Sequence, residues 1–449
     1  MIRLSLSELA RALNCPPPRA EVSIDNIVTD SRKVHHGTLF AALPGSNFDG
    51  HDFAGSAVDL GATALLVSRP LPLDVPQLVV EDVLTALGTL AGLLRTRIDP
   101  TVIGITGSNG KTTVKELLAA ILRLEARVLS TRGNYNNELG VPLSLFGLES
   151  DHRYAVLEMG ASKAGDIAYL AKIANPDLGL ITNIGPAHLG GFGSEEGVAR
   201  AKGELYAALP SEGTAVFNAD EPWLELWKGM NSAGRAVTFG REPGADIQVV
   251  EQGSKPAIAT PGGVIEPRLQ LPGSHNLVNA AAATAVALAL NIGLEKIQRG
   301  LESVKPVPGR LNRIKTEEGW TIIDDTYNAN PASLYSALQV LAGMQGEPWL
   351  VLGDMKELGE GSRKMHREVG EAAKVMGVRR LFTMGEMAVY TSEAFGAGAQ
   401  HFTSRDELSE TLRAALRPGV ICLVKGSRSM GMEAVVNAIA SAPEMREAG

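Results

Sequence analysis

Residues 101–119 read TVIGITGSNGKTTVKELLA. Residues 101–106 predict a buried strand, and residues 114–119 predict the first turns of a helix. Between them lies a loop of seven residues, Gly107-Ser108-Asn109-Gly110-Lys111-Thr112-Thr113. In a phosphate-binding loop, glycines let backbone N–H groups approach phosphate oxygens, the helix N-terminus adds positive charge, the lysine bridges the outer phosphates and the threonine reaches magnesium. The stretch therefore predicts an ATP or GTP site.

The glycine spacing of this loop departs from the general phosphate-loop pattern. The strict spacing requires glycine at the position of Ile105, whereas this chain has Gly104 and Gly107. A glycine turn without a ligand is the alternative interpretation. The order of strand, loop and Lys-Thr-Thr helix start favours nucleotide binding.

Short apolar runs alternate with helix-length amphipathic segments along the whole chain of 449 residues. This alternation predicts an α/β fold with largely parallel sheets, and the length predicts about three domains. Strands are expected at 62–67, 77–80, 101–106, 154–157, 178–182, 321–325, 349–352 and 420–424, and helices at 85–97, 196–206 and 277–290. Breaks at 99–100 and 304–309 divide the chain into a small N-terminal α/β domain (1–98), a central phosphate-loop domain (99–309) and a Rossmann-like C-terminal domain (310–449).

Composition excludes several classes of protein. The formal net charge of −8 opposes a broad contact with nucleic acid or anionic lipid. Cys15 and Cys422 lie far apart, outside any metal-ligand spacing, so both are expected to be buried thiols rather than a disulfide or a zinc site. The start of the chain carries an acid too early for a signal peptide, and the apolar stretch 277–290 is shorter than the roughly 20 residues of a membrane span. We expect a cytoplasmic protein without a membrane span or a nucleic-acid partner.

Three further residues can contribute metal or acid–base chemistry. Glu158 ends the strand 154–157, where a carboxylate can bind magnesium through oxygen; a solvated or capping glutamate is the alternative. His188 follows the strand 178–182 in a glycine-rich loop, and an isolated histidine is more often structural. Lys202 lies in the helix 196–206, where an ordinary surface lysine is the alternative.

Residues 105–113, with the departure at Ile105, resemble the nucleotide loop of the Mur ligase family, and Glu158, His188 and Lys202 follow in that family's order. The resemblance implies ATP as the cosubstrate and two Mg²⁺ ions, bound by Thr112, Glu158, His188 and a carbamylated Lys202. It assigns catalytic roles to Lys111, Lys202 and His188. A lysine carbamate is an anion that can hold magnesium, and its formation requires an amine pKa lowered by burial or positive charge.

Other residues resemble the family's nucleotide contacts outside the loop. His275-Asn276-x-x-Asn279 matches the His-Asn-x-x-Asn element, which implies contact with ATP; a helix N-cap at Asn276 is the alternative. Arg310 and Asp325 resemble residues that reach ATP from the third domain. Both assignments require the nucleotide to lie in a cleft between domains that closes to complete the site.

The outer domains carry the resemblance to a subfamily. Residues 29–32, 39–42, Gly45, Phe48 and 49–51 resemble the UDP-binding domain of the tripeptide- and dipeptide-adding members, without the Rossmann glycine fingerprint of the earlier-acting members. The implied UDP-substrate contacts are Ser31, Arg32, Phe40, Gly45, Asn134, Asn137 and Glu138. Residues 327–331, 352–359 and 425–428 resemble the members that add D-alanyl-D-alanine, and the Asp-Asn-Pro-Arg element of the diaminopimelate-adding members is missing. The implied contacts on the dipeptide side are Asn328, Asn330, Lys425, Ser427 and Arg428.

The resemblance thus implies an ADP-forming ligase, working as a monomer, that joins D-alanyl-D-alanine to UDP-N-acetylmuramoyl-tripeptide through an acyl phosphate. Two alternatives within the superfamily are a diaminopimelate- or lysine-adding Mur ligase and a folylpolyglutamate-type ligase. A phosphate-loop NTPase that regulates a partner protein is an alternative from another class. Its hydrolysis would respond to a macromolecule, whereas ATP consumption by a ligase requires both small substrates.

Overall fold

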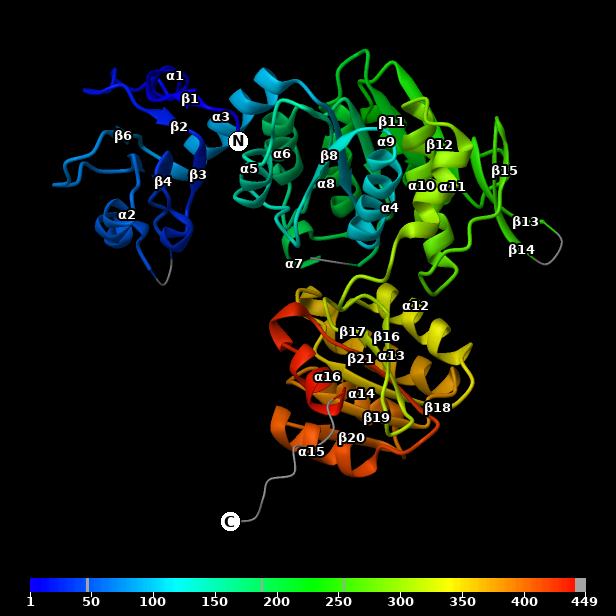
Figure 1. Cartoon of the computed structure of the whole chain (residues 1–449). Helices are drawn as coiled ribbons and strands as arrows, with labels where there is room; N and C mark the ends of the chain where they lie inside the picture. The colour runs from blue at the N-terminus through cyan, green and yellow to red at the C-terminus, as the bar shows by residue number, and fades with distance from the viewer. Residues whose placement is uncertain (46–47, 187–188, 253–254, 441–449) are drawn as a thin grey trace, which may run out of the picture.

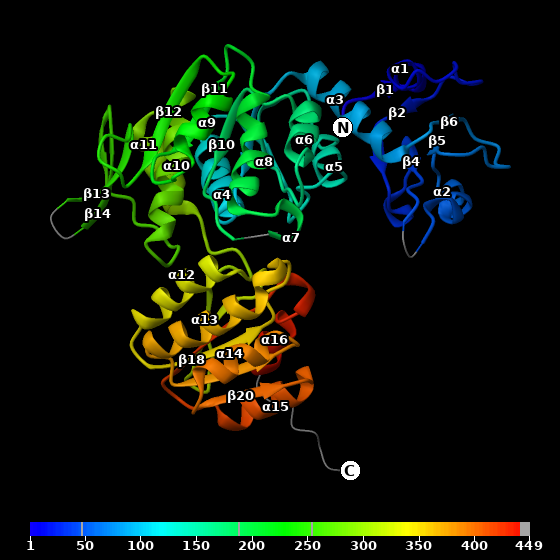
Figure 2. The same ribbon diagram turned by 180° about the vertical axis from the view of Figure 1, so that it is seen from behind.

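Three α/β bodies make up the computed structural model, which describes residues 1–45, 48–186, 189–252 and 255–440. In Figure 1 the N-terminal body lies to the left of the central body, and the C-terminal body lies below the central body. The view from behind gives the same arrangement (Figure 2). The predicted fold class, a three-domain α/β chain, is confirmed.

The N-terminal body has a four-stranded parallel sheet in the order β3-β4-β5-β6 and a short antiparallel ribbon. The ribbon pairs β1 (Leu4–Ser5) with β2 (Ser23–Ile24), and the sheet contains β3 (Asn26–Val28), β4 (Thr38–Ala41), β5 (Ala64–Val67) and β6 (Gln77–Val79). Its helices are α1 (Leu6–Ala12), α2 (Ala54–Asp59) and α3 (Val83–Ile98), with 3-10 turns η1 (Ser31–Lys33) and η2 (Gly50–Phe53). The sequence predicted β5, β6 and α3, but it missed β3 and β4.

Helix α3 joins the N-terminal body to the central one. Its buried Leu87 and Leu90 belong to the same apolar core as Ile167 of α6 (Asp166–Ala174). Buried Arg95 of α3 donates hydrogen bonds to the carbonyl oxygens of Ala174 (3.1 Å) and Asn175 (2.9 Å) at the end of α6. The two bodies are therefore tied by packing as well as by the chain.

The central body is built on a nine-stranded sheet in the order β15-β14-β13-β12-β11-β10-β7-β9-β8. Its strands are β7 (Thr101–Thr106), β8 (Arg127–Ser130), β9 (His152–Glu158), β10 (Leu178–Ile181), β11 (Thr214–Asn218), β12 (Arg235–Gly240), β13 (Ile247–Gln252), β14 (Lys255–Thr260) and β15 (Gly263–Ile265). Its helices are α4 (Lys111–Arg123), α5 (Gly140–Leu145), α6, α7 (Leu189–Phe192), α8 (Glu195–Ala207), α9 (Leu224–Met230), α10 (His275–Ala289) and α11 (Leu294–Ser303). The strands from β8 to β13 run parallel, and β14 and β15 complete an antiparallel edge.

The position of β7 decides where the chemistry of this sheet can occur. It lies between two parallel neighbours, with Ile105 opposite Glu158 of β9 and Thr106 opposite Ile181 of β10. Ligands of open α/β sheets bind at the carboxyl ends of such strands. The fold therefore brings the predicted phosphate loop, Glu158 and the segment after β10 to one edge.

Helix α10 contains the longest apolar stretch of the sequence, and burial explains its composition. Ala280, Ala283 and Val286 have no exposed surface, and they share a core with Leu117 and Leu118 of α4. Within the described residues, no helix is both long and apolar enough to cross a membrane.

The C-terminal body has a six-stranded sheet in the order β16-β17-β21-β18-β19-β20, parallel except for β16. Its strands are β16 (Asn312–Lys315), β17 (Thr321–Asp325), β18 (Glu347–Gly353), β19 (Arg380–Met384), β20 (Ala399–Phe402) and β21 (Val420–Lys425). Its helices are α12 (Pro331–Ala342), α13 (Ser362–Val375), α14 (Ala388–Phe395), α15 (Arg405–Ala415) and α16 (Glu433–Ala440), with 3-10 turns η3 (Gly359–Gly361) and η4 (Arg428–Met430). The three strands that the sequence predicted here are the adjacent, buried β17, β21 and β18.

The two cysteines differ from each other in burial. Cys422 is fully buried in β21, and burial raises the pKa of its thiol to about 12. Cys15 is only half-buried, and its sulfur lies 3.4 Å from the carbonyl oxygen of Val79. The expectation of two buried thiols is therefore wrong for Cys15, which lies at the edge of the small N-terminal sheet.

Candidate functional site

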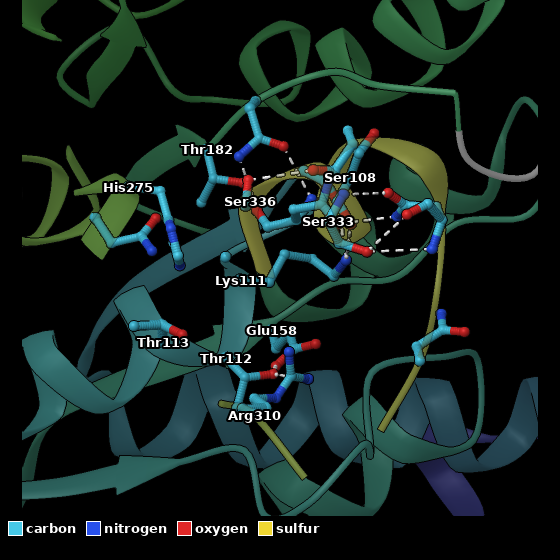
Figure 3. A pocket seen from close by; sticks show the side chains of 18 of the residues that line it. Ser108, Lys111, Thr112, Thr113, Glu158, Thr182, His275, Arg310, Ser333 and Ser336 are labelled. Atoms are coloured by element: carbon cyan, nitrogen blue, oxygen red, sulfur yellow. Dashed lines mark hydrogen bonds between the residues drawn. The ribbon is translucent and has the colours of Figure 1, made fainter. Parts of the chain in front are cut away.

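A cavity of about 740 Å³ lies where the central and C-terminal bodies face each other, and Figure 3 shows its side chains. Most of the residues that the sequence singled out line it. They are Gly107, Ser108, Asn109, Gly110, Lys111, Thr112, Thr113, Asn134, Asn137, Glu138, Glu158, Lys202, His275, Asn276, Asn279, Arg310, Asp325, Asn328, Asn330 and Lys425. They come from segments up to several hundred residues apart, so the cavity is a product of the tertiary fold.

The phosphate loop has a backbone that requires glycine at two positions. Gly107 has φ +144°, and a side chain there would collide with Oγ1 of Thr182. Gly110 has φ +81°, and a Cβ atom there would lie 2.6 Å from Oδ1 of Asn279. Both conformations are strained for other residues. The glycines thus let the loop pack closely against its neighbours just before α4 begins at Lys111.

The segment after β10 holds this loop in place. The backbone N–H groups of Ser108 and Asn109 donate to the carbonyl oxygen (2.8 Å) and Oδ1 (2.9 Å) of Asn183. The hydroxyl of Thr182 donates to the carbonyl oxygen of Asn109 (2.5 Å). Neither Thr182 nor Asn183 was predicted to belong to the site. Their position directly after a parallel strand beside β7 is the signal that could have identified them.

Lys111 lies inside the curve of the loop. Its Nζ donates to the carbonyl oxygen of Gly107 (2.7 Å). Desolvation in the cavity lowers the pKa of this amine, and the charge of Arg310 lowers it further, against the opposing effect of Glu158. The lysine is therefore close to the loop amides that would receive phosphate oxygens.

Glu158 is buried at the end of β9, and both of its carboxylate oxygens accept hydrogen bonds. The hydroxyl of Thr112 donates to Oε2 (2.7 Å), and Nδ2 of Asn136 donates to Oε1 (2.9 Å). This geometry contradicts the alternative of a solvated or capping glutamate. The carboxylate and hydroxyl oxygens are donors that Mg²⁺ prefers, so Thr112 and Glu158 fit a magnesium site at the loop.

Arg310 reaches this pair from the C-terminal body. Its Nη2 donates to Oγ1 of Thr112 (2.8 Å), and its guanidinium lies 4.0 Å from the ring centroid of Tyr327. Figure 3 shows Arg310 beside Thr112 and Glu158. A cation from one body thus contacts the candidate magnesium ligands of the other, which agrees with the predicted reach of Arg310 across the cleft.

Lys202 lies on α8 and is 2% exposed, so the alternative of an ordinary surface lysine is wrong. Burial lowers the pKa of its amine to about 7, and the nearby charge of Lys111 contributes to the shift. Among the described residues, no hydrogen bond or ion pair involves this amine. His188, the other predicted metal ligand, lies outside the described residues.

The start of α10 forms another side of the cavity. Nδ2 of Asn279 donates to Oδ1 of Asn276 (2.9 Å), and Nδ2 of Asn276 donates to the carbonyl oxygen of Pro272 (2.7 Å). The N-cap is Ser274, so the alternative of Asn276 as N-cap is wrong. Desolvation lowers the pKa of His275, as do the charges of Lys425 and Arg241. The three predicted residues therefore lie together at the start of α10, where Asn279 is beside Gly110 of the phosphate loop.

The C-terminal body contributes a buried ion pair to the cavity wall. Nζ of Lys425 lies 2.5 Å from Oδ2 of Asp325 and 2.9 Å from the carbonyl oxygen of Asn328. Burial raises the pKa of Asp325, against the effect of Lys425. Asn330 caps α12 and donates from Nδ2 to Oδ1 of Asn109 (2.9 Å). Residues predicted for ATP and for the dipeptide are thus in contact with one another.

Two residues predicted for the dipeptide side do not line the cavity. Ser427 is buried, and its hydroxyl accepts a hydrogen bond from the backbone N–H of Lys356 (2.8 Å). Arg428 pairs with Glu433 at 3.2 Å on the surface. Ser427 is held by the 354–356 loop rather than directed at the cavity.

The N-terminal residues predicted for UDP also lie away from the cavity. Arg32 is exposed and pairs with Asp30 at 2.9 Å, and Ser31 lies beside it in η1. Phe40 is 1% exposed in the core of the N-terminal body, so its side chain has no face for a ligand. Gly45 is exposed, next to residues outside the described part of the chain.

A further polar group near the end of β11 lines the cavity and was missed from the sequence. Asn218, Asp220 and Glu221 follow one another there, and Arg241 lies after the neighbouring β12. Burial raises the pKa of Glu221 to about 7. The strand-end position again is the signal that could have identified these residues.

Models of one protein family match the three parts of the chain. The Mur ligase family, catalytic domain model matches residues 23–93, the Mur ligase middle domain model matches 105–287, and the Mur ligase, glutamate ligase domain model matches 309–428.

Relatives of similar length come from distant bacteria. The UDP-N-acetylmuramoyl-tripeptide–D-alanyl-D-alanine ligase of Escherichia coli is 43% identical over 98% of this chain and 99% of its own, and that of Bacillus subtilis is 35% identical over 98% of both. Among solved structures, MurF from Acinetobacter baumannii is similar with a TM-score of 0.90 and 36% identity, covering 98% of this chain and 99% of its own. The MurF ligase from Thermotoga maritima in complex with ADP has a TM-score of 0.83 and 31% identity, covering 92% and 97%.

Proposed function

The chain belongs to the Mur ligase family, and from this premise we propose that it joins D-alanyl-D-alanine to UDP-N-acetylmuramoyl-tripeptide. It consumes ATP, releases ADP and phosphate, and forms the pentapeptide precursor of peptidoglycan. The similarity over nearly the full length of ligases that carry this activity in their names supports the assignment.

One observation carries the proposal within this molecule. A single cavity brings the phosphate loop, Glu158 and Lys202 of the central body opposite Arg310 and Lys425 of the C-terminal body. A ligase needs ATP and its amine substrate in one cavity, whereas a regulatory NTPase needs a surface for a partner protein. A cavity shared by two bodies favours the ligase.

The reaction that follows has two steps, and both need positioning and positive charge rather than a nucleophilic side chain. The tripeptide carboxylate attacks the γ-phosphorus of ATP, and the bond to the β,γ-bridging oxygen breaks to release ADP. The amine of D-alanyl-D-alanine then attacks the acyl carbon, phosphate leaves and the amine loses a proton. Lys111, the loop amides and Arg310 are positioned to offset negative charge on the phosphates.

Thr112 and Glu158 would hold one Mg²⁺, and His188 with Lys202 would contribute to a second. Bound magnesium supplies positive charge against the phosphate oxygens. The contact of Arg310 with Thr112 implies that the guanidinium and the metal compete for one hydroxyl. When the metal occupies this hydroxyl, Arg310 would turn toward the phosphates.

Lys202 becomes a carbamate in this proposal. The nitrogen lone pair attacks carbon dioxide, and the nitrogen loses a proton, which leaves an anion on the side chain. With a pKa of about 7, roughly half of the amine is neutral and nucleophilic at neutral pH. Burial at 2% exposure would also protect the product from water.

The remaining parts of the proposal concern the whole chain. We place the domain boundaries at 98/99 and 309/310. The sheets support both boundaries, because the N-terminal sheet ends with β6, the central sheet begins with β7 and the C-terminal sheet begins with β16. The proposal also places the enzyme in the cytoplasm, as a monomer whose domains close around the substrates.

The test is substrate dependence of ADP release. We expect release only when ATP, UDP-N-acetylmuramoyl-tripeptide and D-alanyl-D-alanine are all present, because the acyl phosphate otherwise has no acceptor. Replacing the dipeptide by diaminopimelate or lysine, and the tripeptide by its dipeptide precursor, tests the sister activities. Equal ATP turnover with either substrate omitted would contradict the ligase assignment.

A further inference from the structure

A second lysine lies on α4, the helix that follows the phosphate loop and carries Thr112. Lys115 of α4 is 1% exposed, and its Nζ donates to the carbonyl oxygen of Thr131 (2.7 Å), just after β8. It also pairs with Glu116 at 2.7 Å. None of the chemistry proposed above uses this lysine.

Thr131 in turn holds the backbone of Glu158. Its hydroxyl accepts a hydrogen bond from the N–H of Glu158 (3.0 Å), and its own N–H donates to the carbonyl oxygen of Val156 (3.1 Å). Thr131 is 1% exposed, so water does not compete for these bonds. The strand end that carries the carboxylate is therefore held on one side by Thr131, which Lys115 contacts, and on the other by its pairing with β7.

Thr112 and Lys115 are three residues apart and lie on the same face of α4. Thr112 holds the carboxylate of Glu158 directly, and Lys115 holds its backbone through Thr131. Asn136, which donates to the other carboxylate oxygen, lies in the loop that begins at Thr131. One helix face thus constrains Glu158 at the carboxylate and the backbone.

A buried lysine is an expensive means of packing this position. Removing an ammonium from water is unfavourable, and an apolar side chain of similar length would fill the space without desolvating a charge. This ammonium instead has two partners, the carbonyl oxygen of Thr131 and the carboxylate of Glu116. The position of the lysine thus points to a role in holding the 131–136 loop and Glu158.

We propose that Lys115 is a positioning residue for Glu158, acting through Thr131, and that it sets the affinity of the loop for the divalent cation that accompanies ATP. The proposal rests on the proposed function only in requiring a metal–nucleotide complex at this loop. It does not depend on which amine is ligated.

The test compares Lys115→Met with Thr131→Val, which removes the hydroxyl but leaves the carbonyl and the Lys115–Glu116 pair. Binding of Mn²⁺ to each protein with a non-hydrolysable ATP analogue is measured by electron paramagnetic resonance, without turnover. Loss of such supporting contacts typically weakens metal binding about 10- to 100-fold, and we expect that range for both variants. The double variant should lose little more than either single one, because both break one chain of contacts. Lys115→Arg, which keeps the cation and a donor, should recover part of the affinity.

Arg95→Met is the matched control, because it also removes a buried cation bonded to backbone carbonyls, but far from the cavity. It should lower the melting temperature without changing Mn²⁺ affinity. Unchanged Mn²⁺ affinity in folded Lys115→Met and Thr131→Val would overturn the proposal, as would an equal loss in Arg95→Met. If the wild type binds Mn²⁺ and the analogue normally but does not ligate the dipeptide, the proposed function fails and this inference stands.

Discussion

The phosphate loop and the N-terminal residues predicted to bind UDP differ in how completely the structure assembles them. The loop is fixed by hydrogen bonds from Thr182 and Asn183, and Thr112 already contacts Glu158. Arg32, by contrast, is exposed, and within the described part of the chain its ion pair is with Asp30, two residues away. The phosphate loop is therefore held by neighbours within the central body, whereas the N-terminal residues predicted for UDP lie in a second body.

Asn134, Asn137 and Glu138 link these two regions, because they were predicted for the UDP substrate yet line the central cavity. A substrate that touches both sets of residues would extend from the N-terminal body to the phosphate loop. Binding energy gained far from the reacting carboxylate can then position it at the loop. Substitutions in the two regions test whether they act separately.

Lys111→Met should affect the chemical step and leave the UDP substrate bound. Loss of one fixed charge donor to a transition state typically lowers kcat about 10²- to 10³-fold, and we expect at least that loss of ADP release. Affinity for UDP-N-acetylmuramoyl-tripeptide, measured by isothermal titration calorimetry, should stay within about twofold, a change below roughly 0.4 kcal/mol. A parallel loss of both quantities would show that the two halves are not independent.

Lys202→Ala should reduce turnover about 100-fold with little change in binding of the UDP substrate, because the missing anion serves phosphoryl transfer. A small carboxylic acid should restore part of the activity by entering the vacated space. Exposed Lys172 of α6 provides the control, because Lys172→Ala should behave as wild type. Full activity of Lys202→Ala without any additive would show that the carbamate is not needed.

The pKa of Lys202 also predicts a pH dependence. The pKa of the amine is lowered to about 7. The neutral fraction of the amine is therefore about one tenth at pH 6, and nearly all of the amine is neutral above pH 8. After removal of carbon dioxide, recovery of activity on adding bicarbonate should therefore be faster at pH 8 than at pH 6. Recovery that is independent of pH would contradict carbamate formation on this amine.

Arg32→Ala should raise KM for the UDP substrate about tenfold, equivalent to about 1.4 kcal/mol, while KM for ATP stays unchanged. Steady-state kinetics with each substrate varied in turn measures both. Exposed Arg19 of the same body provides the control, as Arg19→Ala removes a similar charge away from the 29–32 segment. A rise in KM for ATP would contradict this prediction, because it would show that Arg32 also affects ATP binding.

Domain closure is the smallest expected effect. Residues 304–309 connect the bodies that share the cavity, and Arg310 and Asn330 already contact the loop across it. Small-angle scattering should show a smaller radius of gyration when a non-hydrolysable ATP analogue and the UDP substrate are both present. An unchanged scattering curve would contradict closure around the 304–309 segment.

Residues 101–106 form β7 as predicted, and the buried β17, β18 and β21 were identified by continuous apolar runs. Strands β3, β8 and β13 to β15 were missed, and so were the buried β11 and β19. Whether such segments form strands depends on pairing with distant strands as well as on their own composition. The same limitation applies to the site, where Thr182 and Asn183 have ordinary side chains and acquire a role from their position after β10.

The nucleotide chemistry can be predicted from the residues alone, because a phosphate loop is a local arrangement in which glycines, a helix start and a lysine lie within seven consecutive residues. The distant residues that join this loop depend on the tertiary fold. The fold buries Lys202, which lowers the pKa of its amine, and it pairs Asp325 with Lys425. It also brings Arg310 to Thr112, and Lys115 to Thr131, which holds the backbone of Glu158. These properties depend on burial and on neighbours across sheets and bodies, and a linear pattern of residues does not contain either.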